Sequence, residues 1–200
     1  MKEVTGVILA GGKSSRMNFN NKAFALINGQ KIIEIILSKF FSYFDETIII
    51  SNEPLLYSSL NVPVYTDIYP RLGPMSGIHS GLTYAKHDAS FVLACDMPFI
   101  PVEMIDYMLE RINGYDAVVP EIDGFLHMTA AVYRKSSLPV LTENLQHKKL
   151  KMSLLFKELN ALALDEEELK RFGDKTEMFH NINCEEDLIK AEKIAGRLLL

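Results

Sequence analysis

The fold is decided by the stretch Val4-Thr5-Gly6-Val7-Ile8-Leu9-Ala10-Gly11-Gly12-Lys13-Ser14-Ser15-Arg16, which Lys22 follows six positions later. Its apolar first half predicts a buried strand that ends at Gly11-Gly12. Two adjacent glycines after such a strand let the backbone approach a ligand and direct N–H groups at an anion, and the hydroxyls and cations that follow add donors and charge. This order predicts a phosphate-binding loop for a nucleoside triphosphate.

Two common phosphate-binding motifs do not match this loop. A P-loop needs a glycine five positions before Gly12, where Val7 stands, and Gly6 is one position away. The dinucleotide fingerprint G-x-G-x-x-G fails because Gly11 and Gly12 are adjacent and no third glycine follows at the required spacing. An ordinary glycine turn with solvated charges is the alternative that remains.

The composition fits one globular domain over residues 1–200, with 48% hydrophobic and 24% charged residues. The net charge of -5 argues against a general nucleic-acid binder. The sequence has no secretion signal and no run of 18 apolar residues, so we expect no membrane association. Cys95 and Cys184 form no C-x-x-C pair, which indicates neither a zinc site nor a disulfide framework. We expect a cytoplasmic protein.

Strands and helices are predicted to alternate through the first half of the chain. After the opening strand, the apolar pattern predicts strands at residues 47–50, 62–65 and 91–94, and helices at 32–41, 54–60 and 75–86. This alternation indicates βαβ units, and hence an α/β fold with a mostly parallel sheet covered by helices on both faces. In such sheets a ligand binds at the carboxyl ends of the strands.

The second half of the chain has a less regular pattern. It predicts helices at 102–112, 138–145 and 152–159, strands at 117–120, 128–133 and 162–164, and a closing helix through Leu198. Asn28-Gly29 and Asp123-Gly124 are typical of turns. The acidic run from Glu166 to Glu168 indicates the solvated start of a helix.

Two carboxylates follow predicted strands and are expected at the ligand-binding edge. Asp96 comes directly after the strand at 91–94, and Asp67 comes after the strand at 62–65. Mg²⁺ binds one or two carboxylates together with substrate phosphates and waters, so this pair predicts a magnesium site. The alternative interpretation is that Asp96 caps a helix.

The glycine-rich loop and the carboxylates together indicate nucleotidyl transfer. This chemistry needs no covalent nucleophile, because positioning, a metal and cations on the phosphates provide the catalysis. Arg16 and Lys22 are the predicted cations, with solvated loop charges as the alternative. Cys95 is interpreted as a small buried apolar residue. The basic group around Lys149 is either a solvated face or a site for an anionic acceptor.

Several of these segments resemble the molybdenum cofactor guanylyltransferase family. The resemblance is carried by the residues 9–17 with Lys22, by Gly73-Pro74-Met75-Ser76-Gly77-Ile78, by Cys95-Asp96-Met97-Pro98-Phe99-Ile100-Pro101, and by Asn181-Ile182-Asn183. These segments occur in the family's order across nearly the whole chain, and the match is weak from Asp116 to Thr176.

The resemblance implies a Rossmann-like three-layer sandwich of the nucleotide-diphospho-sugar transferase type. It implies transfer of GMP from GTP to the terminal phosphate of molybdopterin, with Mg²⁺, or Mn²⁺ in its place, and release of pyrophosphate. Other molybdenum cofactor biosynthesis proteins and molybdoenzyme chaperones are the implied protein partners. The implied nucleotide-binding residues are Leu9, Ala10, Gly11, Gly12, Lys22, Ser51, Asp67 and Asp96. Asp96 is the implied metal ligand, and with the predicted cations Arg16 and Lys22 it makes up the catalytic residues. The candidate acceptor-binding residues are Asn181 and Asn183, which belong to the resembling motif, and Lys149, which belongs to the basic group described above.

The sequence departs from the family at Asn18 and Asn21. The family usually has a glycine directly after Arg-Met and an acidic residue directly before the lysine. Asparagine tolerates left-handed backbone geometry, so the loop conformation remains accessible. The alternatives are a molybdopterin cytidylyltransferase, a sugar-phosphate nucleotidyltransferase, and a non-catalytic nucleotide-binding accessory protein. Gly11-Gly12 favours the guanylyl branch, because cytidylyl relatives commonly carry Ala-Ala-Gly there.

Overall fold

The computed structural model describes residues 2–11 and 21–198. Its central strand is β1 (Lys2–Leu9), which pairs in parallel with β4 (Phe44–Ile50) on one side and with β6 (Ala89–Ala94) on the other. The residues Val7 and Ile8 point to opposite faces of the sheet and both are fully buried. Both faces of β1 are therefore covered, as the uninterrupted apolar sequence of this strand predicts.

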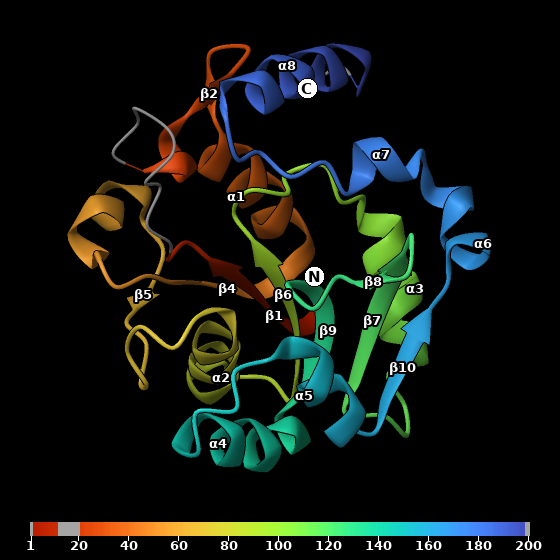
Figure 1. Cartoon of the computed structure of the whole chain (residues 1–200). Coiled ribbons are helices and arrows are strands. Elements are labelled where there is room, and N and C mark those ends of the chain that lie inside the picture. Colours follow the sequence, from red (N-terminus) through yellow and green to blue (C-terminus); the bar gives the residue numbers. More distant parts are fainter. Residues whose placement is uncertain (1, 12–20, 199–200) are drawn as a thin grey trace.

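The main sheet has the strand order β10-β7-β9-β6-β1-β4-β5, with β8 paired to β7 (Figure 1). The remaining strands are β5 (Val64–Tyr65), β7 (Ala117–Ile122), β8 (Phe125–Leu126), β9 (Ala130–Arg134) and β10 (Ala161–Leu164). β9 runs antiparallel to β6 and β7, whereas β1 pairs in parallel with β4 and β6, β4 with β5, and β7 with β10. The predicted α/β fold with a mostly parallel sheet is confirmed.

The helices connect and cover these strands. Their bounds are α1 (Ile32–Tyr43), α2 (Pro74–Tyr84), α3 (Val102–Arg111), α4 (Leu138–Gln146), α5 (Met152–Glu158), α6 (Glu166–Leu169), α7 (Lys175–Met178) and α8 (Glu185–Leu198). Short 3₁₀ segments occupy Lys22–Phe24, Pro54–Leu60, Lys135–Ser137 and Lys170–Phe172. β2 (Leu26–Ile27) and β3 (Gln30–Lys31) form a separate small hairpin.

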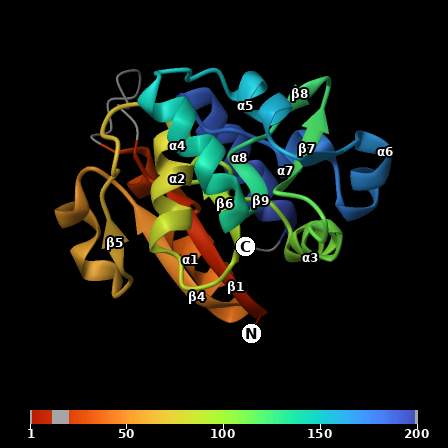
Figure 2. The same ribbon diagram turned by 90° about the horizontal axis from the view of Figure 1, so that it is seen from below.

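Helices α1 and α2 pack against opposite faces of β1, and glycines permit both contacts. A Cβ atom on Gly6 would lie 2.6 Å from Cδ2 of Phe40 in α1, and one on Gly81 of α2 would lie 2.5 Å from Cγ1 of Val7. Both distances are shorter than carbon atoms tolerate, so these glycines let the helices approach the sheet closely. The neighbour of α2 is α4, which lies beside it (Figure 2). The helix α1 is linked to α3 by a hydrogen bond that Tyr43 donates to Asp106.

Most predicted elements are present, and the differences have local causes. Both predicted turns form, with φ values of 50° and 85° at Asn28-Gly29 and of 51° and 75° at Asp123-Gly124. The helix predicted from Glu166 is α6, which Asp165 caps through a capping box. The segment 54–60 is 3₁₀ rather than α. The strand expected at 128–133 begins at Ala130, because the N–H of Ala130 bonds to the carbonyl of His127 in a turn.

No helix in residues 2–11 and 21–198 combines the length and the apolar character that crossing a membrane would require.

Candidate active site

The carboxyl ends of three parallel strands lie level with one another. In the register of the sheet, Leu9 of β1 pairs with Ile50 of β4 and with Ala94 of β6. The N–H of Ala10 bonds to the carbonyl of Ile50 at 2.9 Å, and the N–H of Cys95 bonds to the carbonyl of Leu9 at 3.0 Å. The start of the glycine-rich loop therefore lies beside the segment that carries Asp96.

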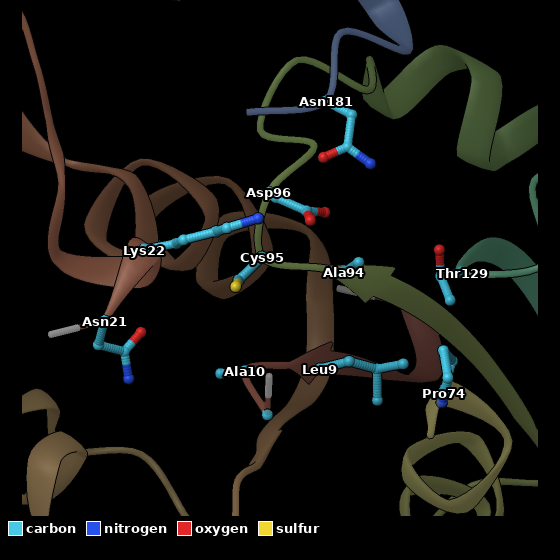
Figure 3. Close-up of a pocket in the computed structure, with 11 residues that line it drawn as sticks. Leu9, Ala10, Asn21, Lys22, Pro74, Ala94, Cys95, Asp96, Thr129 and Asn181 are labelled. Atoms are coloured by element: carbon cyan, nitrogen blue, oxygen red, sulfur yellow. The ribbon is translucent and has the colours of Figure 1, made fainter. Parts of the chain in front are cut away.

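A cavity of about 310 Å³ opens at this edge of the sheet (Figure 3). It is lined by the start of the glycine-rich loop, by the residues after that loop, and by segments that follow other strands. Its lining residues are Leu9, Ala10, Gly11, Asn21, Lys22, Pro74, Ala94, Cys95, Asp96, Thr129 and Asn181. The structure thus brings five of the residues predicted for the site into one cavity, together with Asn181, which was predicted for the acceptor.

Asp96 lies in the turn after β6, and one of its carboxylate oxygens accepts no hydrogen bond from the described residues. Oδ1 is buried and has no hydrogen-bond partner among the described residues. Burial raises the pKa of Asp96, and the positive charge of Lys22, which extends toward Asp96 in Figure 3, opposes this shift. The residue at the N-cap of α3 is Pro101, so the alternative that Asp96 caps the following helix is wrong.

The donor set fits a divalent cation that is shared with a substrate phosphate. Within residues 2–11 and 21–198, no three His, Cys, Asp or Glu side chains gather into a group able to hold a metal ion. Mg²⁺ needs no such group, because one carboxylate, phosphate oxygens and waters complete its coordination. Oδ1 of Asp96, buried and without a partner in the described part of the chain, is an oxygen ligand of the required kind.

Hydrogen bonds fix both the backbone segment that begins at Lys22 and the ammonium group of its side chain. Asn21 caps the 3₁₀ segment Lys22–Phe24, because its Oδ1 accepts a hydrogen bond of 3.0 Å from the N–H of Ala23. Nζ of Lys22 donates to Oδ1 of Asn183 at 2.6 Å, and Nδ2 of Asn183 donates to Oδ1 of Asn181 at 3.0 Å. The segment before α8 is therefore connected to Lys22 by side-chain hydrogen bonds.

The same segment is also connected to the turn that carries Asp96. The N–H of Ile182 donates to the backbone carbonyl of Asp96 at 3.0 Å. Ile182 itself is fully buried, which anchors the segment between its two flanking asparagines. Asn181 and Asn183, predicted as acceptor-binding residues, thus lie next to Asp96 and Lys22.

Asp67 and Ser51 lie at the same edge of the sheet, beyond the cavity lining. Asp67 follows β5, and its Oδ2 accepts a hydrogen bond of 2.8 Å from Nδ2 of Asn52. Burial raises the pKa of Asp67, and the bond from Asn52 opposes this shift. The side chain of Ser51 is buried, and its hydroxyl accepts from the N–H of Glu53 at 3.2 Å.

Asn52 was not among the predicted site residues, although it connects two of them. It bonds to Asp67, and a Cβ atom on Gly11 would lie 4.0 Å from its Nδ2. The strand predicted at 47–50 indicated its position, since the residues after a strand of a parallel sheet reach the ligand edge. Thr129 was also missed, because it lies in the segment of weak family resemblance and belongs to no motif. The N–H of Ala94 donates a hydrogen bond of 2.7 Å to the carbonyl of Thr129, and this bond places Thr129 at the cavity.

The other residues predicted for the site lie away from the cavity or outside the described residues. Lys149 is exposed in the connection between α4 and α5, where its N–H donates to the carbonyl of Asn144, and it is not among the cavity-lining residues in the described part of the chain. Gly12 and Arg16 fall in residues 12–20, outside the described residues. Cys95, interpreted as a small buried apolar residue, is half-buried and lines the cavity. Desolvation raises the pKa of its thiol to about 12, which keeps it protonated.

Comparison with known proteins identifies the family. The sequence profile of the MobA-like NTP transferase domain matches residues 6–162, which include the central strands and every cavity-lining residue named above except Asn181. The chain belongs to this family. The MobA-like family match confirms the resemblance drawn from the motifs.

Curated relatives of this MobA-like chain match it over its full length. A probable molybdenum cofactor guanylyltransferase of Clostridium perfringens strain SM101 is 38% identical over 199 residues, covering 97% of this chain and 100% of the relative. The molybdenum cofactor guanylyltransferase of Desulfosudis oleivorans is 34% identical over 201 residues, covering 99% of this chain and 100% of the relative.

Solved structures show the same MobA-like fold. Molybdopterin-guanine dinucleotide biosynthesis protein A from Archaeoglobus fulgidus superposes with a TM-score of 0.84 and 25% identity, covering 97% of this chain and 100% of that one. A CMP:2-keto-3-deoxy-manno-octonic acid synthetase complexed with CTP superposes with a TM-score of 0.77 at 11% identity, covering 98% of this chain and all of that one, and shares the fold alone. The predicted nucleotide-diphospho-sugar transferase type of fold is confirmed.

Proposed function

We propose that this protein transfers GMP from GTP to molybdopterin and forms the guanine dinucleotide form of the molybdenum cofactor. An oxygen of the acceptor's terminal phosphate attacks the α-phosphorus of GTP, the bond from this phosphorus to the α–β bridging oxygen breaks, and pyrophosphate leaves. The observation that carries the proposal is Oδ1 of Asp96, which is buried in the cavity beside Lys22 and the start of the glycine-rich loop and has no hydrogen-bond partner in residues 2–11 and 21–198. The names of the full-length relatives support the same reaction.

We assign the nucleotide to the side of the cavity formed by the end of β1. The backbone of Leu9, Ala10 and Gly11, continued by Gly12, would contact the nucleotide, because glycines permit a close approach of the chain. Asp67 and Ser51 would lie toward the base and sugar, with Asn52 between Asp67 and Gly11. These assignments agree with the common edge at which β1, β4 and β5 end.

Two cations would neutralise the phosphates. The place of Lys22 in the cavity lining and its bond to Asn183 support this role, and its flexible stem would let the ammonium group follow the transferring phosphoryl group. Arg16, the other cation predicted from the sequence of the glycine-rich loop, is assigned the same role. Charge neutralisation of this kind lowers the barrier because negative charge on the phosphates repels an anionic acceptor.

Asp96 would hold the Mg²⁺ ion, or Mn²⁺ in its place, through Oδ1, which has no hydrogen-bond partner among the described residues. When bound, the metal polarises the phosphoryl oxygens and neutralises charge on the leaving pyrophosphate. Asn181 in the cavity lining and Asn183, which donates to it, would orient the acceptor phosphate, since their amide groups provide both donors and acceptors. Lys149 is the basic residue proposed for the more distant part of the acceptor.

We assign the activity to a single domain over residues 1–200 in the cytoplasm, where GTP is available. The product would pass to other proteins of molybdenum cofactor biosynthesis or to molybdoenzyme chaperones. Transfer of the product to a recipient protein is a separate step and takes no part in the reaction at the cavity.

The test combines nucleotide binding with turnover. Thermal-shift measurements with GTP, CTP, ATP and UTP in the presence of Mg²⁺ are expected to show stabilisation mainly by GTP, because a ligand that binds only the folded chain raises its stability by mass action. Pyrophosphate release with GTP and molybdopterin then measures the reaction, with and without a chelator.

Each alternative function gives a different result in this test. Equal shifts with all four nucleotides would contradict the guanylyl assignment, and a preference for CTP would indicate a cytidylyltransferase. Tight GTP binding without pyrophosphate release would indicate a non-catalytic accessory protein. A sugar phosphate that replaces molybdopterin as acceptor would indicate a sugar-phosphate nucleotidyltransferase.

A further inference from the structure

Tyr57 is a fully buried tyrosine whose hydroxyl joins the two flanks of the glycine-rich loop. It belongs to the 3₁₀ segment Pro54–Leu60 that follows β4. Its Oη donates a hydrogen bond of 3.1 Å to the carbonyl of Ala10 and accepts one of 2.8 Å from Nδ2 of Asn21. Ala10 and Asn21 are 11 positions apart in the chain, and both line the cavity.

The directions of these two bonds follow from the chemistry of the groups. A backbone carbonyl can only accept and an amide NH₂ can only donate, so Tyr57 gives its single proton to Ala10 and receives one from Asn21. Burial raises the pKa of Tyr57 to about 12, so the hydroxyl keeps this proton at neutral pH. The arrangement uses both functions of the hydroxyl at once.

The identity of residue 21 matters for this arrangement. Asn21 donates to Tyr57 through Nδ2 while its Oδ1 accepts from the N–H of Ala23, so both ends of the amide are used. An aspartate has acceptors only, and it would compete with the carbonyl of Ala10 for the one tyrosine proton. The asparagine found here instead of the family's acidic residue therefore allows all three groups to be bonded together.

The network fixes Lys22 relative to the nucleotide-binding backbone. Lys22 follows Asn21 directly, and Asn21 is tied through Tyr57 to Ala10 at the end of β1. The ring of Phe24, in the same 3₁₀ segment as Lys22, packs on Tyr57 with 5.3 Å between ring centroids. Without the hydroxyl, the ring would still pack, but Asn21 would lose its connection to β1.

We propose that Tyr57 is a positioning residue for this site: its buried hydroxyl holds Asn21, and with it Lys22, at the distance from the Leu9–Gly11 backbone that a bound triphosphate requires. This inference rests on the proposed function in taking the ligand to be a nucleoside triphosphate. Tyr57 itself does not line the cavity formed by the described residues, so it acts through Ala10 and Asn21.

The experiment uses two probes and a matched control. Binding of GTP and of inorganic tripolyphosphate is measured by titration calorimetry on the wild type, on Tyr57→Phe and on Tyr43→Phe. Tyr43→Phe also removes one tyrosine hydroxyl, which donates to Asp106 between α1 and α3 and is not part of the cavity lining. Tripolyphosphate reports on Lys22 whichever base the site prefers.

Tyr57→Phe is expected to weaken the binding of both probes about tenfold, the effect of losing a hydrogen bond that leaves its partners unpaired. Tyr43→Phe is expected to bind both within about twofold of the wild type. In turnover, Tyr57→Phe raises KM for GTP and leaves KM for molybdopterin unchanged, a split that a loss of stability alone would not produce. Equal tripolyphosphate binding by the wild type and Tyr57→Phe would overturn the inference.

A second variant covers the case in which Tyr57→Phe does not fold. Asn21→Ala removes the same link from its less buried end, and is expected to weaken tripolyphosphate binding to a similar extent. Where both fold, the double variant is expected to lose no more than about threefold beyond the single variant that binds less tightly, because both changes break the shared hydrogen bond between Tyr57 and Asn21. Losses that multiply would show two independent effects and contradict the inference. If the wild type binds tripolyphosphate but prefers a nucleotide with another base, the guanylyl assignment is contradicted, whereas the positioning role of Tyr57 is not.

Discussion

Nζ of Lys22 donates a hydrogen bond of 2.6 Å to Oδ1 of Asn183, which lies 161 positions later in the chain. This contact joins the residue proposed for the phosphates of GTP to a residue proposed for the acceptor. Lysine has three donors, so Lys22 can keep this bond and still contact a phosphate. The two halves of the proposed reaction therefore meet at one side chain.

Lys22→Met is expected to weaken GTP binding about tenfold to a hundredfold. A hydrogen bond that involves a charged group contributes about 1.5–3 kcal/mol, and methionine keeps the length of the side chain without the charge. Asn183→Ala, which leaves Lys22 in place but removes its partner, is expected to weaken binding by about tenfold at most. Titration calorimetry with GTP measures both. Wild-type affinity in Lys22→Met would mean that this lysine does not contact the phosphates.

Asp96→Asn is expected to lower pyrophosphate release about a hundredfold to a thousandfold. The amide keeps the volume of the side chain and removes the negative charge that would hold a divalent cation, and losing one charge-stabilising group of this kind costs about 3–4 kcal/mol in the transition state. Since burial raises the pKa of Asp96, its ionised form is already disfavoured in the fold, and the variant is expected to melt no lower than the wild type. Release at the wild-type rate by the folded variant would place the metal elsewhere.

Gly81→Ala is expected to lower the free energy of unfolding by about 1–3 kcal/mol, because the new Cβ would lie 2.5 Å from Cγ1 of Val7 and force α2 away from β1. Gly196→Ala is the matched control: it is also a helical glycine, and no described atom lies within 4 Å of its Cβ position. The control is expected to gain up to about 1 kcal/mol from helix propensity. Urea unfolding measures both, and equal effects would contradict the close contact at Gly81.

Lys39 in α1 is expected to make stability depend on pH in the alkaline range. Its Nζ donates to the carbonyls of Pro98 and Ile100, at 3.1 and 2.7 Å, and burial lowers its pKa from 10.5 to about 8, opposed by the charge of Glu103. Between these two values the unfolded chain binds the proton more strongly than the folded chain. The free energy of unfolding therefore rises with pH through this window.

The comparison of the wild type with Lys39→Met isolates this contribution, since other groups titrate alike in both. From about pH 7 to about pH 10, the wild type is expected to gain roughly 2 kcal/mol relative to the variant. Urea unfolding at each pH gives the difference. A difference that stays constant over this range would show that Lys39 keeps the ordinary lysine pKa in the folded chain.

Features that depend on neighbouring residues could be read from the sequence. The apolar run up to Leu9 predicted β1, because a continuous apolar segment is stable only with both faces covered. Asn28-Gly29 and Asp123-Gly124 predicted turns, because these residues accept the positive φ values found there. Asp96 could be placed at the ligand edge, since it directly follows a strand of a parallel sheet.

Features that depend on packing could not be read in this way. Ser51 and Asn52 are adjacent, and only the position of the strand end decides that Ser51 is buried while Asn52 reaches Asp67. The same holds for β9, whose antiparallel place between β6 and β7 has no local signature. Lys149 and Asn183 were both predicted for the acceptor, and only the fold separates the exposed lysine from the asparagine bonded to Lys22.

The sequence by itself determined the βαβ order and the family, because each is carried by residues close together in the chain. The tertiary structure decided which distant side chains meet: Asn183 at Lys22, and Tyr57 between Ala10 and Asn21. The physical reason is that a hydrogen bond requires its donor and acceptor to lie about 3 Å apart, and for residues far apart in the chain this distance is set by strand register and helix packing.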